Sequence, residues 1–365
     1  MIAFLKKTII IFYIIICSSC FKRPVTAPGD DHIYPDTLRG RADKQGLILG
    51  AAISTERLAE TNFIDILTNE FNCIVAENQM KFSYLEPAEN NFTFTEADEI
   101  ITFAKTHNMK VRGHTLIWHS DSQLPAWVKS KSSNEIKAVA ENHIAKILTH
   151  MTGEIYAWDV ANEIFKDDAS GLRNRQETDN AYSPWAFSAT DDTIIKAAFY
   201  KAKEIAETYN DNVKLMLCDY NNETMGRAKA DLMYNTVADW VAQGVPIDGV
   251  AFQCHFGTEW SYNFNQIKAN IDRYQELGLI VEITEFDVAI PEPVTDTDTQ
   301  LETQFYSEIM NIVLAKNLPA FLTWGLTDKY SWLNTCFTGK DPGLLFDENY
   351  QKKDAYYAVK NSLNN

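Results

Sequence analysis

Two glutamates lie where apolar β-type segments end, and together they could perform nucleophilic and acid–base chemistry. Glu163 closes the segment WDVANE, and Glu285 lies in the segment ITEFDV. Two carboxylates about 5–5.5 Å apart suit retaining glycoside hydrolysis, in which one is the nucleophile and the other is first an acid and then a base. The pKa values of the two must differ, because the acid has to keep its proton while the nucleophile stays charged.

Two further residues could keep Glu285 ionised. His255 ends the strand candidate that precedes the one carrying Glu285, and Asp287 lies two residues beyond Glu285. A hydrogen bond from His255 would favour the charged form of that carboxylate, and Asp287 could orient the histidine. Either glutamate alone could be a solvated strand end, but the four residues together favour catalysis.

Other segment ends carry groups suited to binding sugars. Hydrogen-bonding side chains stand at Asn78, Lys81, His114, Asn162 and Gln253, and indole faces for stacking on pyranose rings stand at Trp118, Trp324 and Trp332. Any one of them could instead be a satisfied buried group or part of the core. The sequence contains no H-E-x-x-H, G-x-S-x-G or phosphate-loop motif, and we predict no metal and no cofactor.

The elements that must position these residues alternate between strand and helix. Eight strand candidates cover 47–53, 73–78, 110–118, 155–162, 213–221, 249–256, 279–288 and 320–327, with helical periodicity in stretches such as 136–150, 193–209, 226–242 and 299–316. This alternation predicts a (β/α)8 TIM barrel with its site at the carboxyl ends of the strands. The alternative is a doubly wound open sheet, but no G-x-G-x-x-G turn follows any strand.

The N-terminus has a different composition. Residues 1–20 are typical of a lipoprotein signal peptide, with Lys6 and Lys7, an apolar run and Cys20 as the predicted lipidation site. The alternative is ordinary signal cleavage without a lipid. Residues 21–40 are rich in Pro and Gly and predict a linker, so 41–365 form one catalytic domain. We therefore expect an exported protein, either secreted or held in the cell envelope as a lipoprotein at the periplasm or cell surface.

The net charge bears on possible partners, and the cysteine content bears on metal binding and disulfides. The 33 basic and 50 acidic residues give a net charge of −17, so a nucleic acid partner is excluded. The four domain cysteines, Cys73, Cys218, Cys254 and Cys336, lack metal-site spacing. Buried single thiols are favoured over disulfides, but the sequence leaves both open.

Seven blocks in the chain, in order, resemble those of glycoside hydrolase family 10, the endo-β-1,4-xylanases, over 41–365. The blocks are ENQMK at 77–81, GHTLIWH at 113–119, YAWDVANE at 156–163, DYN at 219–221, QCH at 253–255, ITEFDV at 283–288 and WGLTDKYSW at 324–332. The family usually has Asn where Cys218 stands, and Asp121-Ser122 looks inserted.

The resemblance implies that Glu163 is the acid/base and Glu285 the nucleophile. It implies that the sugar at the cleavage point and on its non-reducing side is bound by Glu77, Asn78, Lys81, His114, Trp118, Asn162, Gln253, His255, Trp324 and Trp332. Tyr220 would stack on the leaving-side sugar.

We therefore predict a monomeric, retaining endo-β-1,4-xylanase that acts on xylan and xylo-oligosaccharides. Xylose lacks the hydroxymethyl group of glucose, so a tight wall near Lys81 and Trp324 could discriminate between the two sugars by steric clash. One alternative is a β-1,4-glucanase, or a mixed xylanase/glucanase, of the same clan. A less favoured alternative is a non-catalytic glycan-binding lipoprotein.

Overall fold

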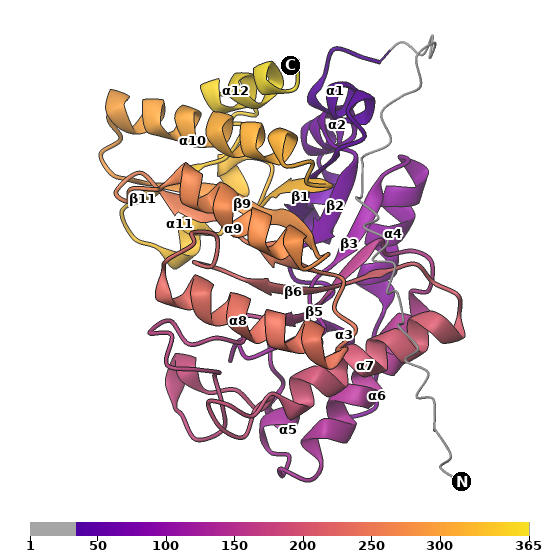
Figure 1. Ribbon diagram of the computed structural model, residues 1–365. Coiled ribbons are helices and arrows are strands. Elements are labelled where there is room, and N and C mark those ends of the chain that lie inside the picture. Colours follow the sequence, from indigo (N-terminus) through magenta and orange to yellow (C-terminus); the bar gives the residue numbers. More distant parts are fainter. Residues whose placement is uncertain (1–33, 365) are drawn as a thin grey trace, which may run out of the picture.

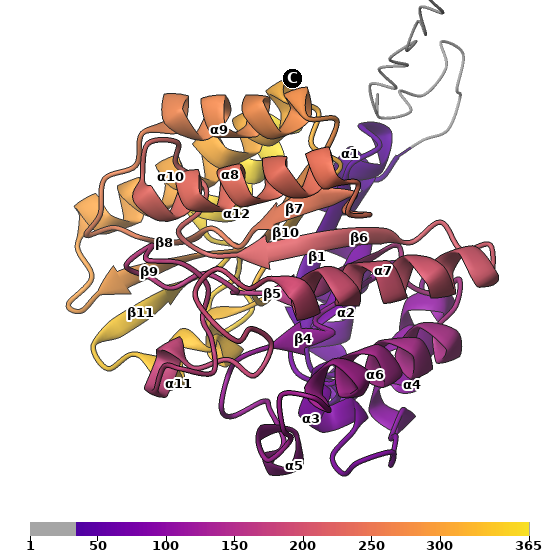
Figure 2. The same cartoon turned by 60° about the horizontal axis from the view of Figure 1, so that its bottom comes forward.

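The computed structural model describes residues 34–364, which form a barrel of parallel strands surrounded by helices (Figures 1 and 2). The predicted signal peptide, Cys20 and the linker up to residue 33 lie outside the described residues. The barrel strands are β1 (Ile48–Ile53), β2 (Cys73–Ala76), β3 (Lys110–Gly113), β5 (Ala157–Asn162), β6 (Lys214–Asp219), β7 (Gly249–Phe252), β9 (Ile280–Pro291) and β10 (Ala320–Thr323). They pair in chain order, and β10 pairs with both β9 and β1, so the barrel closes. The predicted (β/α)8 TIM barrel is confirmed.

Two of the predicted strands are each divided in two. The third continues as β4 (Ile117–Trp118), which pairs with β5, and the sixth continues as β8 (His255–Gly257), which pairs with β9. Cys254, between β7 and β8, has a φ of +60°, which interrupts the extended backbone. A late strand, β11 (Lys340–Gly343), runs antiparallel to the end of β9. These additions extend the sheet beyond the barrel mouth and carry site residues.

The predicted helical stretches correspond to α6 (Ile136–His150), α7 (Thr193–Thr208), α8 (Ala228–Gln243) and α10 (Asp296–Ala315). The other helices are α2 (Thr61–Glu70), α4 (Thr95–Thr106), α9 (Phe264–Glu276) and α12 (Asp354–Ser362), with short ones at α1 (Leu38–Lys44), α3 (Phe82–Leu85), α5 (Ala126–Lys129), α11 (Leu333–Cys336), η1 (Thr55–Ala59), η2 (Asp179–Ala181) and η3 (Asp328–Tyr330). On α7, buried Ile195, Phe199 and Ala202 recur every three or four residues, which places them on one face toward the barrel. No helix in residues 34–364 is long and apolar enough to cross a membrane.

The predicted linker, 21–40, extends too far toward the C-terminus. Thr37 caps α1 by accepting a hydrogen bond from the backbone N–H of Gly40 at 3.1 Å, and fully buried Leu38 donates its N–H to Glu70 Oε2 at 2.8 Å. Asp36 forms a 3.1 Å ion pair with Lys360 of α12, which joins the two ends of the domain (Figure 1). The folded domain therefore begins by Asp36. A seven-residue helix was too short to show periodicity within a Pro- and Gly-rich stretch.

Charged side chains fill part of the barrel interior below the site. Arg112 on β3 donates to Asp159 on β5 at 2.8 Å and to Glu282 on β9 at 3.1 Å, and all three are buried. Burial alone would raise the pKa of Asp159, but the charge of Arg112 and the hydrogen bonds from His114 and Arg112 together outweigh burial and hold that pKa below its usual range. A buried guanidinium with two carboxylate partners meets the requirement that buried charges be paired. This network supports the residues at the barrel mouth from below.

Candidate active site

Glu163 lies immediately after β5, among uncharged hydrogen-bond donors. Its carboxylate accepts a hydrogen bond from Trp118 Nε1 at 2.9 Å and one from Gln253 Nε2 at 3.0 Å. Gln253 Nε2 also lies 3.1 Å from Asn162 Oδ1. The side chain of Glu163 is partly open to solvent, because its residue is only half-buried. A half-open carboxylate at the barrel mouth can be reached by a bound substrate or by water.

Glu285 on β9 lies in a different environment, buried beside histidine. His255 Nε2 lies 3.4 Å from Glu285 Oε2, and His255 Nδ1 donates to Asp287 Oδ1 at 2.9 Å. Burial alone would lower the pKa of His255, but the charge and hydrogen bond of Asp287, with Glu285, raise it to about 10. The ring is therefore an imidazolium at neutral pH. Asp287 therefore contacts His255 through Oδ1, and its Oδ2 accepts from Trp332 Nε1 at 2.6 Å.

This cationic neighbour acts on the ionisation of Glu285. Burial alone would raise the pKa of Glu285, but His114 and His255 outweigh burial and hold the pKa below its usual range. The two glutamates thus lie in different surroundings. Glu285 is kept as a carboxylate, whereas Glu163 accepts hydrogen bonds from the neutral side chains of Trp118, Asn162 and Gln253.

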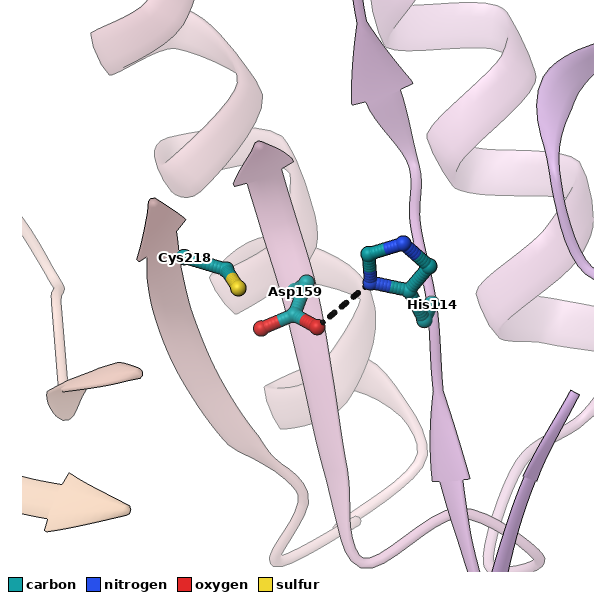
Figure 3. A group of neighbouring side chains, drawn as sticks. All are labelled: His114, Asp159 and Cys218. Atoms are coloured by element: carbon teal, nitrogen blue, oxygen red, sulfur yellow. Dashed lines mark hydrogen bonds and ion pairs between the residues drawn. The ribbon is translucent and has the colours of Figure 1, made fainter. Parts of the chain in front are cut away.

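His114, Asp159 and Cys218 form a buried cluster on three neighbouring strands (Figure 3). His114 Nδ1 donates to Asp159 Oδ2 at 2.9 Å, and the candidate ligand atoms of the three residues lie within 4.8 Å of one another. A cation bound between them would lie beside the positive charge of Arg112, which already forms a hydrogen-bonded ion pair with Asp159. The cluster is therefore better suited to hydrogen bonding under Glu285 than to metal binding.

Lys81 is buried where three predicted binding residues meet. Its Nζ lies 3.2 Å from Asn78 Oδ1, 4.9 Å from the ring centroid of Trp118 and 5.8 Å from that of Trp324. Burial lowers the pKa of Lys81, an effect partly offset by the charges of Glu285, Glu77 and Glu163. A buried ammonium next to an amide oxygen and two indoles can donate hydrogen bonds to sugar hydroxyls.

Trp324 and Trp332 each lie against a histidine of the site. The Trp324 ring meets the His114 ring edge-on with centroids 5.2 Å apart, and the Trp332 ring lies 5.0 Å from that of His255. Tyr220 lies on another side of Glu163: its hydroxyl donates to Asp167 and accepts from Arg173 at 2.9 Å. Lys229 Nζ lies 3.5 Å from the Tyr220 ring centroid. The structure thus brings the predicted residues to one barrel mouth, where Tyr220 has its own partners in Asp167, Arg173 and Lys229.

With this geometry established, comparison with known proteins identifies the family. The family model for glycosyl hydrolase family 10 matches residues 37–362. The chain belongs to glycosyl hydrolase family 10. This family-10 chain is 33% identical over 330 residues to endo-1,4-beta-xylanase B of Thermotoga neapolitana, covering 88% of this chain and 90% of that one. It is 32% identical over 329 residues to a beta-1,4-xylanase of Dictyoglomus thermophilum, covering 87% and 88%.

Solved structures agree with that assignment. Xylanase 10B of Thermotoga petrophila, crystallised with xylobiose, has a TM-score of 0.82 and 33% identity over 91% of this chain and 98% of that one. Native xylanase 10B of Thermotoga maritima has a TM-score of 0.80 and 33% identity, with coverage of 90% and 98%. Family membership makes this chain a glycoside hydrolase, as the two glutamates predicted.

Several residues that complete the family-10 site were missed from the sequence. Arg112 and Asp159 carry a detectable signal, because charged residues inside apolar strand segments require buried partners. Asp167 and Arg173, which hold Tyr220, lie in a long loop where no periodicity points to them. Gln123, immediately after the insertion noted in the sequence, donates to Asn78 Oδ1 at 3.2 Å, so that loop also reaches the site.

The four cysteines that lie within residues 34–364 of this family-10 chain are all free. Cys73, Cys218 and Cys254 are buried, as the sequence favoured, whereas Cys336 is exposed on α11. Cys218, where the family resemblance led us to expect Asn, lies against Glu285: its Sγ is 3.5 Å from Oε1.

Proposed function

We propose that this family-10 chain is a retaining endo-β-1,4-xylanase that hydrolyses internal bonds of xylan and xylo-oligosaccharides. The observation that carries the proposal is the contrast between the glutamates. His114 and His255 together hold the pKa of Glu285 below its usual range, and Glu163 is bonded to neutral donors. The names of the relatives and the xylobiose in the Thermotoga petrophila structure support xylan as the substrate.

The reaction proceeds in two displacements. A carboxylate oxygen of Glu285 attacks the anomeric carbon while Glu163 gives its proton to the glycosidic oxygen, so the bond to the leaving chain breaks. Glu163 then takes a proton from water, the water oxygen attacks the same carbon, and the ester to Glu285 breaks. Each displacement inverts the anomeric carbon, so the β configuration is retained.

Other residues position the substrate for these steps. We assign to Lys81, Asn78 and His114 the binding of hydroxyls of the sugar at the cleavage point, which their mutual contacts beside Trp118 and Trp324 support. The indoles of Trp324 and Trp332 bound the space around that sugar, where a hydroxymethyl group would have to fit. Rejection of glucose by such a wall is a steric effect.

The test compares the release of reducing ends from xylan and from cellulose by the wild-type enzyme and two variants. We expect xylan to be strongly preferred, and Glu285→Gln and Glu163→Gln to lower turnover by several orders of magnitude. Glu276→Gln, on the outer surface of α9, is the matched control and should retain full activity. A preference for cellulose would instead establish a glucanase, and tight xylan binding without hydrolysis would establish a glycan-binding protein.

We also propose that the chain is exported and anchored through an acylated Cys20, with secretion after ordinary cleavage as the alternative. The support is the sequence of residues 1–20, with its two early lysines, apolar run and terminal cysteine. Metabolic labelling with radioactive palmitate should mark the wild-type protein but not Cys20→Ala. An unlabelled wild-type protein in the culture medium would refute the anchor.

We propose that the enzyme acts as a monomer, because a single chain supplies both glutamates and every partner described for them. Light scattering of the purified enzyme should give a mass near 41.5 kDa, less any removed signal. Activity confined to a dimer fraction would contradict this.

A further inference from the structure

Cys218 is a buried residue near the end of β6 whose thiol contacts one oxygen of Glu285. It is on β6, where it pairs with Asn162 of β5 and Ala251 of β7, and its side chain is fully buried. Its Sγ lies 3.5 Å from Glu285 Oε1, with the thiol as donor. Figure 3 shows the side chain directed toward the cluster of Asp159 and His114.

The two carboxylate oxygens of Glu285 have different neighbours. His255 Nε2 faces Oε2 at 3.4 Å. The histidine nearest to Oε1 is His114, whose Nδ1 is 3.8 Å away and already donates to Asp159 at 2.9 Å. Among the residues that the structure describes, the thiol of Cys218 is the one side chain recorded as a hydrogen-bond donor to Oε1.

The ionisation state of the thiol makes it a donor. Burial and the negative charges of Asp159 and Glu285 raise the pKa of Cys218 well above its usual range, so its proton remains at the working pH. The charged and titratable groups that act on Glu285 from the surrounding elements are Lys81, His114, Asp159 and His255. A neutral S–H among them can favour the carboxylate without adding a charge.

We propose that Cys218 is a positioning residue for the nucleophile: its S–H holds Oε1 of Glu285 while His255 holds Oε2, which fixes the carboxylate plane and favours its ionised form. The proposal rests on the proposed function, because it takes Glu285 as the nucleophile. Loss of the donor should raise the pKa of Glu285 and move the acid limb of the pH–rate profile upward. A hydroxyl group at the same position should leave the acid limb of the pH–rate profile at its wild-type pH.

The experiment measures kcat/KM against pH on an aryl β-xylobioside whose leaving group needs no acid, so the acid limb reports Glu285 alone. In Cys218→Ala we expect that limb to rise by roughly half to one pH unit, the shift typical of losing one hydrogen bond. Cys218→Ser should keep the limb at or below its wild-type position. Cys218→Val removes the donor but fills the space, and it carries the test if the Ala variant does not fold.

Cys254→Ala is the matched control, since Cys254 is an equally buried thiol that belongs to the apolar core. It should lower thermal stability without moving the acid limb. A merely structural Cys218 would behave in the same way, and an unmoved limb in Cys218→Ala and Cys218→Val would overturn the proposal. Equal shifts in the Ser and Ala variants would overturn it too.

A second measurement separates this proposal from the proposed function. A carbon-13 titration of the Glu285 carboxyl, assigned with Glu285→Gln, gives its pKa without any turnover. If wild-type enzyme fails to cleave the xylobioside, the proposed function is wrong, but the titration still decides the role of Cys218. A Glu285 pKa that is higher in Cys218→Ala than in the wild type supports the role, and an equal pKa refutes it.

Discussion

Replacing Asp287 by Asn should remove the charge on His255 while leaving its position almost unchanged. Asp287 accepts hydrogen bonds from two sides, from His255 Nδ1 at 2.9 Å and from Trp332 Nε1 at 2.6 Å. The indole N–H can only donate, so the amide oxygen of the new Asn must face Trp332. Its NH2 group then faces His255 Nδ1, which has to accept. The ring becomes neutral, with its proton on Nε2 toward Glu285.

The size of the expected rise in the pKa of Glu285 follows from the charge that His255 loses. The pKa of His255 is raised from 6.5 to about 10, which corresponds to roughly 5 kcal/mol in favour of the imidazolium. Two unit charges at the 3.4 Å between His255 Nε2 and Glu285 Oε2 interact by about 5 kcal/mol at an effective dielectric constant of about 20. Because the neutral ring still donates a hydrogen bond to Glu285, we expect only part of this interaction energy to be lost. The pKa of Glu285 should rise by roughly one to two pH units.

The assay combines the pH dependence of kcat/KM with nitrogen-15 spectra of the imidazole. In Asp287→Asn the acid limb should move upward, kcat/KM should fall about tenfold per pH unit below it, and His255 should be neutral at pH 8. Asp272→Asn, which neutralises a carboxylate paired with Lys316 on the outer surface, is the control and should change neither reading. A cationic His255 at pH 8 in Asp287→Asn, or an unmoved acid limb, would refute the reasoning.

The same substitution has a consequence for stability. A histidine whose pKa is raised by folding stabilises the fold fully below its unfolded pKa, and that contribution is lost as the pH rises through the folded pKa. For His255 the loss should occur between about pH 6.5 and 10. The unfolding free energy of the wild type should therefore fall over this window, and that of Asp287→Asn should be flatter. Urea unfolding at pH 6, 8 and 10 measures the difference.

Two other substitutions test the substrate pocket and the domain boundary. Lys81→Met should raise KM for xylo-oligosaccharides by roughly 10- to 100-fold with little change in melting temperature, because it removes a buried charged donor beside Asn78. An unchanged KM would place Lys81 outside the binding site. Glu70→Gln should lower the free energy of unfolding in urea by about 1–3 kcal/mol, because Glu70 Oε2 accepts from the Leu38 N–H and the Tyr356 hydroxyl. An unchanged free energy of unfolding would mean that Leu38 belongs to the linker and not to the folded domain.

The fold could be predicted because its signal is repeated along the chain. Each barrel strand is a short apolar run that ends in polar residues, as in 155–162 followed by Glu163, and each is separated from the next by a helical period. Parallel pairing then places all the strand ends at one mouth, so Glu163, His255 and Glu285 could be grouped without knowing any distance. The element boundaries were accurate to within a few residues wherever a strand or helix was long enough to show its period.

The remainder depended on contacts between segments that sequence spacing does not encode. The end of the linker was misplaced because α1 is stabilised by Glu70, 32 residues beyond Leu38, and not by its own periodicity. The partners of Tyr220 come from a loop that follows a different strand, so no local pattern joins Arg173 to the Tyr220 hydroxyl. Cys218 on β6 could likewise be recognised from the sequence as a departure from the family pattern. Its contact with Glu285 could not be predicted, because that contact exists only in the closed barrel.

The difference between the two glutamates follows from where their strands lie. Glu285 shares its strand with Asp287 and has β8 beside it, so a charged carboxylate–histidine pair forms next to it. Glu163 follows β5, where the nearest donors are the amide of Gln253 and the indole of Trp118, both neutral. Gln253 also accepts the Glu285 backbone N–H through its own carbonyl at 3.1 Å. Gln253 therefore lies between the half of the site that holds the carboxylate–histidine pair beside Glu285 and the half in which Glu163 accepts hydrogen bonds from neutral side chains.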